Sequence, residues 1–240
     1  MTTTQKKMIW AWPTRAFHWL LALGFIVAFI TGETDNLRNI HAAFGLMAGG
    51  AVLFRIFYGF TGPMYSRFSD FPLGLNQMKL FFRNLFKSPQ TYTGHNPPAS
   101  MVMLAIIIVG VVTALSGYLA YNQPAFISVD FHAVGEFHEV IAKVFLFLVL
   151  AHLAGVILDF LQHGKQGALF SIFNGLKVTN DPAVTLKPIH QITGVAMVVF
   201  SVLLFTLAVN QKTPQKQVET QTEANQENEA EDAESDHFDD

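Results

Sequence analysis

The 240-residue chain contains no cysteine. This absence excludes disulfide bonds, thiolate-ligated zinc or iron–sulfur sites, and haem attached covalently through a Cys-x-x-Cys-His motif. Charge is also scarce, since only 14% of the residues are Asp, Glu, Lys or Arg, whereas 51% are hydrophobic and the mean hydropathy is +0.33. This composition is unusual for a soluble domain and indicates a membrane protein. A non-covalent cofactor held by histidine remains compatible with it.

The few charges are unevenly distributed, although the formal net charge is only −3. Residues 211–240 hold ten Asp or Glu beside Lys212 and Lys216, whereas the rest of the chain holds 13 Lys or Arg and 8 Asp or Glu. A stretch with so many acids and so few apolar residues is typical of disorder. We therefore predict a mildly basic body followed by a disordered acidic tail.

Five stretches have the length and apolar character of a membrane-spanning helix, which needs about 20 residues. They are residues 12–31, 40–60, 100–121, 136–161 and 189–209. The first resembles a signal peptide in its position, but no small-x-small cleavage site follows it and it carries Arg15 and His18. The sequence predicts an all-α integral membrane protein with five retained spans.

Basic residues predict the orientation of these spans, because cytoplasmic connections are enriched in Lys and Arg. The opposite connections are poor in them, with Arg38 alone in 32–39 and none in 122–135. We expect a multi-pass protein of a bacterial inner membrane, with a cytoplasmic N-terminus and a periplasmic C-terminus. The basic residues predicted to lie at the cytoplasmic side are Lys6, Lys7, Arg15, Arg67, Lys79, Arg83, Lys87, Lys165, Lys177 and Lys187.

The connection 61–99 contains an amphipathic segment, 75–87. Its apolar residues Leu75, Met78, Phe82, Leu85 and Phe86 fall on one face, and basic residues flank the other, although Leu80 breaks the pattern. One explanation is an interfacial helix on the inner leaflet. An equally good one is a cap that covers the helix bundle.

Four of the nine histidines occupy special positions in the predicted spans. His41 and His138 begin the second and fourth spans at the periplasmic level, whereas His18 and His152 lie at the cytoplasmic level of the first and fourth. His152 follows His138 by fourteen positions, which is about 40° short of four helical turns. The two residues are therefore about 21 Å apart along the helix axis. The fourth span therefore presents two imidazoles on one face, and facing helices can complete two sites.

Haem b suits two opposed imidazoles in a protein without cysteine. Gly45 and Gly49 follow His41 at helical spacing, while Gly24 and Gly155 follow His18 and His152, so small residues could give a macrocycle room. Close helix packing would explain a lone glycine, but beside the histidines we favour room for haem. A zinc or copper site would gather its ligands at one level. A proton relay lacks acidic residues at mid-membrane depth, and a non-redox anchor or transporter with structural histidines stays a further alternative.

The segments that carry these histidines resemble the bacterial cytochrome b561 family over roughly residues 8–170. They read "FHWLLALGF", "HAAFGLMAGGAVLFRIFYGFTGPMYSRFSDF", "GHNP" and "FHEVIAKVFLFLVLAHLAGV". The family includes b-type cytochrome subunits of nickel–iron hydrogenases and is similar to those of formate dehydrogenases. The resemblance implies a four-helix bundle with two haems b, in which His41 and His138 bind the periplasmic-side iron and His18 and His152 the cytoplasmic-side iron.

The resemblance also implies electron transfer between a quinone pool and a redox partner, such as a periplasmic c-type cytochrome or a dehydrogenase subunit. With quinone, the protein would be a quinol:acceptor oxidoreductase; a superoxide oxidase of the same fold is a rival. No nucleic-acid partner is expected. We expect three parts, namely a dihaem four-helix domain (1–170), a cytoplasmic connector with the fifth span (171–210), and the tail (211–240).

Three further residues are candidates around the cytoplasmic-side haem. His95 and Asn96 could hydrogen-bond a quinone, although the sequence Asn96-Pro97-Pro98 also suits a helix start. Arg55 lies inside the second span, where a cation needs a partner, so it could pair with a haem propionate or serve as a positive-inside anchor. Arg15 and Arg67 are weaker propionate candidates, because anchoring explains them without haem.

Overall fold

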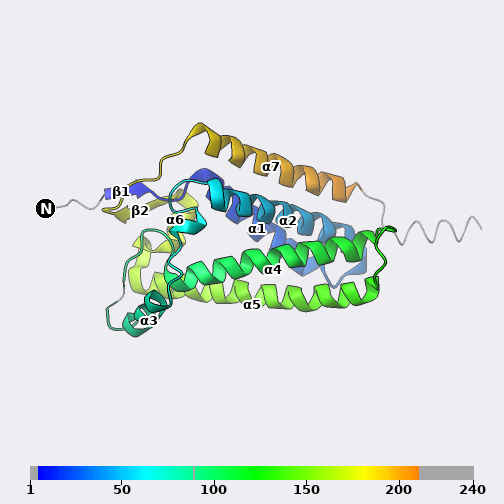
Figure 1. Cartoon of the computed structure of the whole chain (residues 1–240), viewed down its shortest axis with the longest axis horizontal. Helices are drawn as coiled ribbons and strands as arrows, with labels where there is room; N and C mark the ends of the chain where they lie inside the picture. The colour runs from blue at the N-terminus through cyan, green and yellow to red at the C-terminus, as the bar shows by residue number, and fades with distance from the viewer. Residues whose placement is uncertain (1–4, 89, 211–240) are drawn as a thin grey trace, which may run out of the picture.

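The computed structural model describes residues 5–88 and 90–210 as an elongated bundle of helices (Figure 1). The long helices are α1 (Trp12–Thr31), α2 (Arg38–Thr61), α4 (Pro97–Asn122), α5 (Phe131–His163) and α7 (Pro188–Val209). All five are long and apolar enough to cross a membrane. The predicted all-α membrane fold with a fifth span is confirmed.

Caps explain where these helices begin. Pro13, Pro97 and Pro188 each stand in the first turn of their helix, where the missing N–H costs nothing. The span predicted at about 136–161 lies within α5, which begins earlier, at Phe131, because the side chain of Asp130 accepts hydrogen bonds from the backbone of His132 and Ala133.

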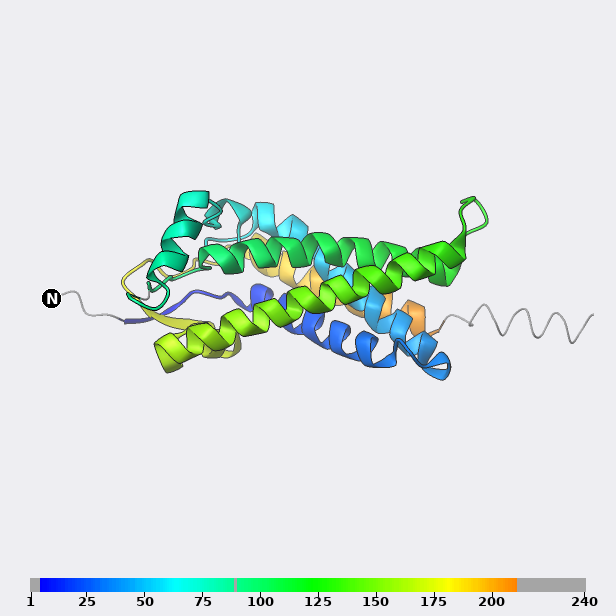
Figure 2. The same cartoon turned by 90° about the horizontal axis from the view of Figure 1, so that it is seen from below.

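The small elements gather at one end of the bundle, which we call the sheet end (Figures 1 and 2). They are β1 (Gln5–Met8), α3 (Leu75–Asn84), α6 (Ala168–Asn174) and β2 (Leu176–Thr179), with short 3-10 turns at Phe68–Asp70 and Gly164–Gln166. The opposite end, with the connections 32–37 and 123–130, is called the turn end; it contains the 3-10 turn Asp35–Leu37. Strands β1 and β2 pair antiparallel, with Lys6 opposite Val178, so the segment before α1 is tied to the segment before α7. The sequence analysis did not predict these strands.

Helix packing is uneven across the bundle. Helix α1 packs on α2, α2 on α4, and α4 on α5, while α7 packs on α2 and α1. Phe17, Ala51 and Met197 form a buried cluster in which α1, α2 and α7 meet. Helix α5 contacts α4 extensively and is the least buried of the five spans. It meets α1 through the rings of Phe25 and Phe145, whose centres are 5.0 Å apart, but its backbone does not pack closely on α1 or α2.

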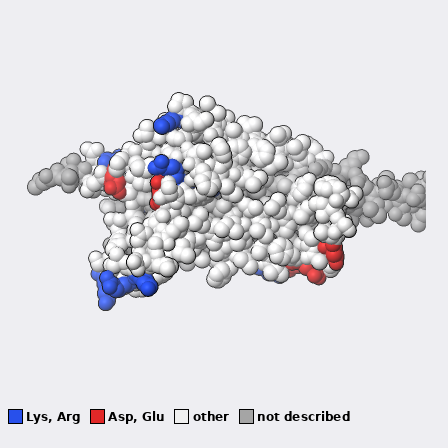
Figure 3. Space-filling view, in the orientation of Figure 1, with Lys and Arg blue, Asp and Glu red and all other residues white. Residues whose placement is uncertain are grey.

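Helix α3 lies beside the bundle at the sheet end, where basic side chains cluster on the surface (Figures 1 and 3). Leu75 and Phe82 of this helix and Phe86 just after it are exposed, as are Lys79 and Arg83, whereas Met78 and Leu85 are partly buried. An exposed apolar face favours the interfacial helix over the cap, because a cap would bury that face against the other helices.

The predicted division into 1–170, 171–210 and 211–240 remains a prediction. Its first boundary falls inside α6, and β2 and α7 both pack on parts of the first region. The predicted disordered tail lies outside the described residues.

Candidate functional site

Helix α5 faces two other helices through two pairs of histidines. The ring centres of His41 on α2 and His138 on α5 are 6.0 Å apart, and those of His18 on α1 and His152 on α5 are 6.4 Å apart. We call the first the outer pair, toward the turn end, and the second the inner pair. The structure thus pairs the same histidines that the sequence predicts to lie at the same depth in the membrane.

The spacing within each pair suits one metal ion between two imidazoles. Bonds of about 2 Å from one metal to a nitrogen of each ring on opposite sides would place the ring centres roughly 6 Å apart. The four histidines do not converge, and within residues 5–88 and 90–210 no group of three or more His, Asp or Glu is arranged to hold a metal. This arrangement disfavours the zinc or copper alternative, which needs more ligands at one level.

Backbone carbonyls orient the rings of the outer pair. Nδ1 of His41 lies 2.7 Å from the carbonyl oxygen of Ala28, and Nδ1 of His138 lies 3.0 Å from that of Thr113. Since a carbonyl oxygen only accepts, each Nδ1 donates its hydrogen, and in the neutral ring Nε2 keeps a free electron pair. This is how metal-binding histidines are usually held.

Two glycines that the sequence analysis missed make room for these rings. A Cβ atom on Gly117 would lie 2.8 Å from Cε1 of His138, and one on Gly32 would lie 3.4 Å from the ring of His41. The first would force the imidazole to shift. Gly117 belongs to the third predicted span, and its level matches that of His138, which is the signal that could have identified it.

The predicted small residues fall into two kinds. A Cβ atom on Gly45 or Gly155 would meet no atom within 4 Å, so both positions leave space beside a histidine. A Cβ on Gly49 would lie 2.8 Å from Cβ of Ala114, and one on Gly24 would lie 2.8 Å from Cβ of Ala48. Gly49 and Gly24 therefore serve close helix packing, whereas Gly45 and Gly155 face open space.

Arg55 is a buried cation that has no anionic partner among the residues that the structure describes. Its side chain is 2% exposed and lies among aromatic rings, with the guanidinium 5.0 Å from the ring centre of Phe68 and 5.8 Å from that of Phe17. Nη2 lies 3.8 Å from the sulfur of Met103, and Nη1 has no hydrogen-bond partner within the described part of the chain. A charge in this position calls for an anion that the protein itself does not supply there.

The two other arginines that were weighed for propionates have protein partners. Arg15 donates a hydrogen bond of 2.6 Å from Nη1 to the carbonyl oxygen of Phe173, and Arg67 forms an ion pair of 3.3 Å with Asp70. Nε of Arg15 is also buried without a hydrogen-bond partner in the described part of the chain, but Arg55 differs in having no carbonyl or carboxylate partner there at all. Arg55 is therefore the arginine best suited to a buried anion.

The candidate quinone residues lie at the sheet end. The side-chain oxygen of Asn96 accepts a hydrogen bond of 2.8 Å from the backbone of Ala99, so it caps α4. The ring of His95 lies between Trp10 and Phe71, with ring centres 4.7 and 4.9 Å away. Burial, and secondarily the positive charge of Arg55, lowers the pKa of His95 to about 3, so the ring is neutral at pH 7.

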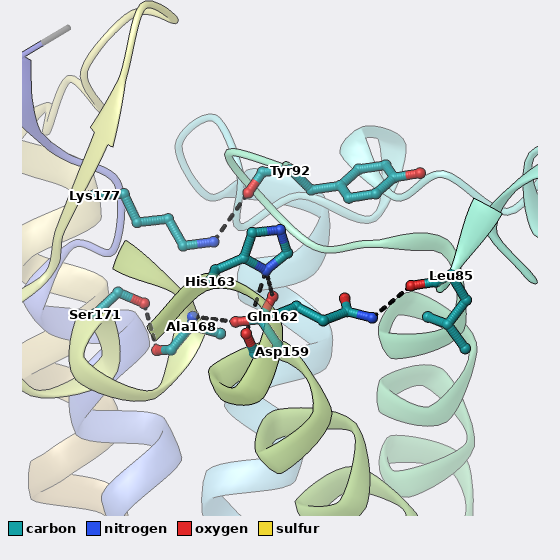
Figure 4. A network of polar contacts seen from close by, with 8 residues as sticks. All are labelled: Leu85, Tyr92, Asp159, Gln162, His163, Ala168, Ser171 and Lys177. Carbon is teal, nitrogen blue, oxygen red and sulfur yellow. Dashed lines mark hydrogen bonds and ion pairs between the residues drawn. The ribbon is translucent and has the colours of Figure 1, made fainter. Parts of the chain in front are cut away.

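A polar network fastens the sheet end of α5 (Figure 4). Asp159 accepts a hydrogen bond of 2.5 Å from the backbone of Ala168 and pairs with His163 at 3.2 Å. Gln162 donates to the carbonyl oxygen of Leu85, and the ammonium of Lys177 donates to that of Tyr92. The bonds of Asp159 and Gln162 hold the last turns of α5 against α6 and Leu85, and so help to fix the position of His152 along the bundle, while the bond of Lys177 ties β2 to Tyr92.

Comparisons with known proteins agree with this arrangement of histidines. The chain matches the prokaryotic cytochrome b561 family over residues 9–175. It is 26% identical over 140 residues to a probable Ni/Fe-hydrogenase B-type cytochrome subunit of Azotobacter vinelandii, and 25% identical over 137 residues to a probable Ni/Fe-hydrogenase 1 B-type cytochrome subunit of Escherichia coli K12. Each match covers 46% of this chain and 58% of the relative, so the chain spans less than two thirds of those proteins. No solved structure matches it.

The family match covers well over half of the chain, including both histidine pairs and the four helices α1, α2, α4 and α5. Helix α7 lies beyond the matched residues. Members of this family typically bind b-type haem, and the five spans make the chain a multi-pass membrane protein. The chain belongs to the prokaryotic cytochrome b561 family and is a membrane b-type cytochrome.

Proposed function

We propose that the protein binds two haems b and carries electrons across the bacterial inner membrane between a quinone pool and a redox partner protein. The observation that carries this proposal is the pair of facing imidazoles at each of two levels of α5, with ring centres 6.0 and 6.4 Å apart. When bound, haem supplies a one-electron redox centre. The two sites are about 21 Å apart along α5, in a hydrocarbon core about 30 Å thick.

The protein's own residues have distinct tasks in this proposal. His41 and His138 bind the outer iron through Nε2, while their Nδ1 hydrogen bonds to Ala28 and Thr113 hold the rings in place. His18 and His152 bind the inner iron. Gly45 and Gly155 leave room for the macrocycle, and Arg55 pairs with a propionate through the nitrogen that has no protein partner.

Quinone is proposed to bind at the sheet end, near the inner pair. His95 is neutral there, so it can donate a hydrogen bond from one nitrogen and accept one at the other. The side-chain oxygen of Asn96 already caps α4, which leaves its amide N–H groups for a quinone oxygen. Neutral donors suit a ligand whose oxygens take up and release protons.

The redox partner is proposed to dock at the turn end, close to the outer pair. A periplasmic c-type cytochrome or a dehydrogenase subunit fits this position. Support comes from the relatives, which are named as probable cytochrome subunits of Ni/Fe-hydrogenases. A hydrogenase is a redox enzyme, so a redox partner is expected for this chain too. With quinone as donor and such a partner as acceptor, the protein would be a quinol:acceptor oxidoreductase.

A reduced-minus-oxidised spectrum of the purified full-length protein, with haem quantified, tests the proposal. The wild type should show b-type α and Soret bands and two haems per chain. His138→Ala and His152→Ala should each leave one haem, because each removes a ligand from a different pair. His132→Ala is the matched control, since this exposed histidine lies on the same helix and belongs to neither pair.

The alternatives give different spectra. A non-redox anchor or transporter with structural histidines would contain no haem in any variant. Two haems at full occupancy in either His138→Ala or His152→Ala would contradict the assignment of the pairs.

A further inference from the structure

A pocket of about 350 Å³ lies at the sheet end, between the end of α2 and the start of α7. Its walls are the segment Phe60–Met64, Arg67, and the residues Thr185, Lys187 and His190. Three of these residues come from the segment that lies beyond the family match, so the pocket is a feature that α7 adds to the family fold. Neither histidine pair contributes to it.

The wall between the two helices is fixed by His190. Nδ1 of this buried ring accepts a hydrogen bond of 3.2 Å from the backbone of Lys187, and the ring centre lies 6.4 Å from that of Tyr58 on α2. The imidazole therefore lies in the contact between the first turn of α7 and the last turn of α2. The contact between these two helices therefore helps to define the shape of the pocket, in addition to its exposed side chains.

The pocket is lined by cations and hydroxyl groups. Lys187 is exposed at its rim, and no described acidic residue is among the lining residues. Asp70 pairs with Nε and Nη2 of Arg67, which leaves Nη1 of that guanidinium for another acceptor. Thr61 and Thr185 add hydroxyl groups. An ammonium, a guanidinium nitrogen and hydroxyls together form a site that suits a phosphate group.

The position of the pocket relative to the spans indicates where that phosphate comes from. The pocket lies where α2 ends at Thr61 and α7 begins at Pro188, which is the level of the lipid head groups. Below it, Leu53, Phe57 and Phe60 follow one another at helical spacing on α2 and are 53%, 55% and 73% exposed. This apolar stripe leads away from the pocket toward the middle of the membrane, as an acyl chain would.

We propose that this pocket binds the phosphate head group of an anionic phospholipid, with an acyl chain along the stripe Leu53–Phe57–Phe60. The excess positive charge selects an anionic lipid such as phosphatidylglycerol over a zwitterionic one. The bound lipid covers the contact between α2 and α7 and stabilises the fifth span against the four-helix body.

Native mass spectrometry of the full-length protein in detergent tests this proposal. Phosphatidylglycerol, phosphatidylethanolamine and inorganic phosphate are titrated separately. The wild type should retain one phosphatidylglycerol and bind phosphatidylethanolamine more weakly. Lys187→Glu should weaken binding of phosphatidylglycerol at least about fivefold, since one basic residue near the surface contributes about that factor. Thr185→Trp should have a similar effect by filling the pocket without a change of charge.

Lys165→Glu is the matched control, because it makes the same charge change at an exposed position of the sheet end outside the pocket. It should retain the lipid like the wild type. The proposal is overturned if Lys187→Glu and Thr185→Trp both bind phosphatidylglycerol like the wild type. It is also overturned if inorganic phosphate at millimolar concentration displaces the lipid, which would make this a site for free phosphate. The readout does not depend on the haems, so it is independent of the proposed electron transfer.

Discussion

At the residue scale, the two histidine pairs differ in how their rings are held. Both outer rings donate from Nδ1 to backbone carbonyls, whereas Nδ1 of His18 is buried without a hydrogen-bond partner in the described part of the chain. A hydrogen bond at Nδ1 fixes the ring and raises the basicity of the ligating nitrogen. The outer site is therefore the more strongly preorganised of the two for an axially ligated metal.

Gly45 offers a sharp test of the proposed outer haem. Leucine at this position meets no neighbouring atom at its Cβ and has a helix propensity about 1 kcal/mol better than that of glycine. Gly45→Leu should therefore leave the fold intact while its side chain occupies the space beside His41. We expect the outer haem to fall below half occupancy, measured as haem per chain, without a decrease in the temperature of helix unfolding.

Gly49→Leu is the informative comparison for this variant. Its Cβ would collide with Ala114, so the α2–α4 contact should loosen and the unfolding temperature should fall. If Gly45→Leu retained two haems per chain, the space beside Gly45 would not be the place of the macrocycle.

His95 makes the stability of the sheet end depend on pH. Its pKa in the folded protein is about 3, below the ordinary value of 6.5. The unfolded chain therefore takes up a proton below pH 6.5, whereas the folded chain does not until about pH 3. The stabilisation is present above pH 6.5 and is lost progressively as the pH falls from 6.5 toward 3, at up to about 1.4 kcal/mol per pH unit.

His95→Gln should flatten this dependence, because the amide does not titrate. The measurement is the unfolding temperature of the detergent-solubilised protein between pH 7.5 and 4.5. His132→Gln serves as control, since His132 is exposed at the turn end. Equal slopes for the wild type and His95→Gln would show that His95 does not take part in the acid lability.

At the scale of elements, the spans could be predicted from the sequence because each is a long apolar run. The first was predicted at 12–31 and is Trp12–Thr31, and the fifth was predicted at 189–209 and is Pro188–Val209. Strands β1 and β2 could not be predicted, since Gln5–Met8 and Leu176–Thr179 are four residues each and pair across some 170 residues. Only the tertiary fold brings them together.

The same limit applies to the candidate site. The levels and the shared face of His138 and His152 follow from helical geometry, so their partners could be predicted. The role of Gly117 could not be deduced from α4 alone, because it depends on how α4 and α5 pack. Which glycines pack against a helix and which leave space likewise depends on neighbours that periodicity does not reveal, as Gly45 and Gly49 show.

The register of α5 between its two histidines provides a test at this scale. One alanine inserted after Phe147 would rotate the following residues by about 100° and shift them by about 1.5 Å. His138 and His152 would no longer share a face, so one of the two haems should be lost. One alanine inserted after the exposed Phe126, in the connection between α4 and α5, should leave both haems bound. Two haems per chain in the first variant would contradict the requirement for a shared face.

At the scale of the whole molecule, charge and the number of spans together define an orientation. In the space-filling view most basic side chains lie toward the sheet end, while acidic side chains are visible both beside them and at the turn end (Figure 3). Of the basic residues at the connections between spans, Arg38 is the one toward the turn end. Because positive charge favours the cytoplasmic side, we expect the sheet end to face the cytoplasm. With five spans, the end of α7 at Val209 would then face the periplasm.

Reporter fusions test this orientation directly. Alkaline phosphatase, which is active only in the periplasm, should be active when fused after Gln123 or after Asp240. β-Galactosidase, which is active only in the cytoplasm, should be active when fused after Lys87. The opposite pattern at all three sites would invert the protein and place the inner pair toward the periplasm. Activity of the cytoplasmic reporter after Asp240, together with the expected result at the other two sites, would mean that α7 does not cross. The proposed side of the partner depends on this result, because only the expected orientation brings the outer pair, His41 and His138, within reach of a periplasmic redox protein.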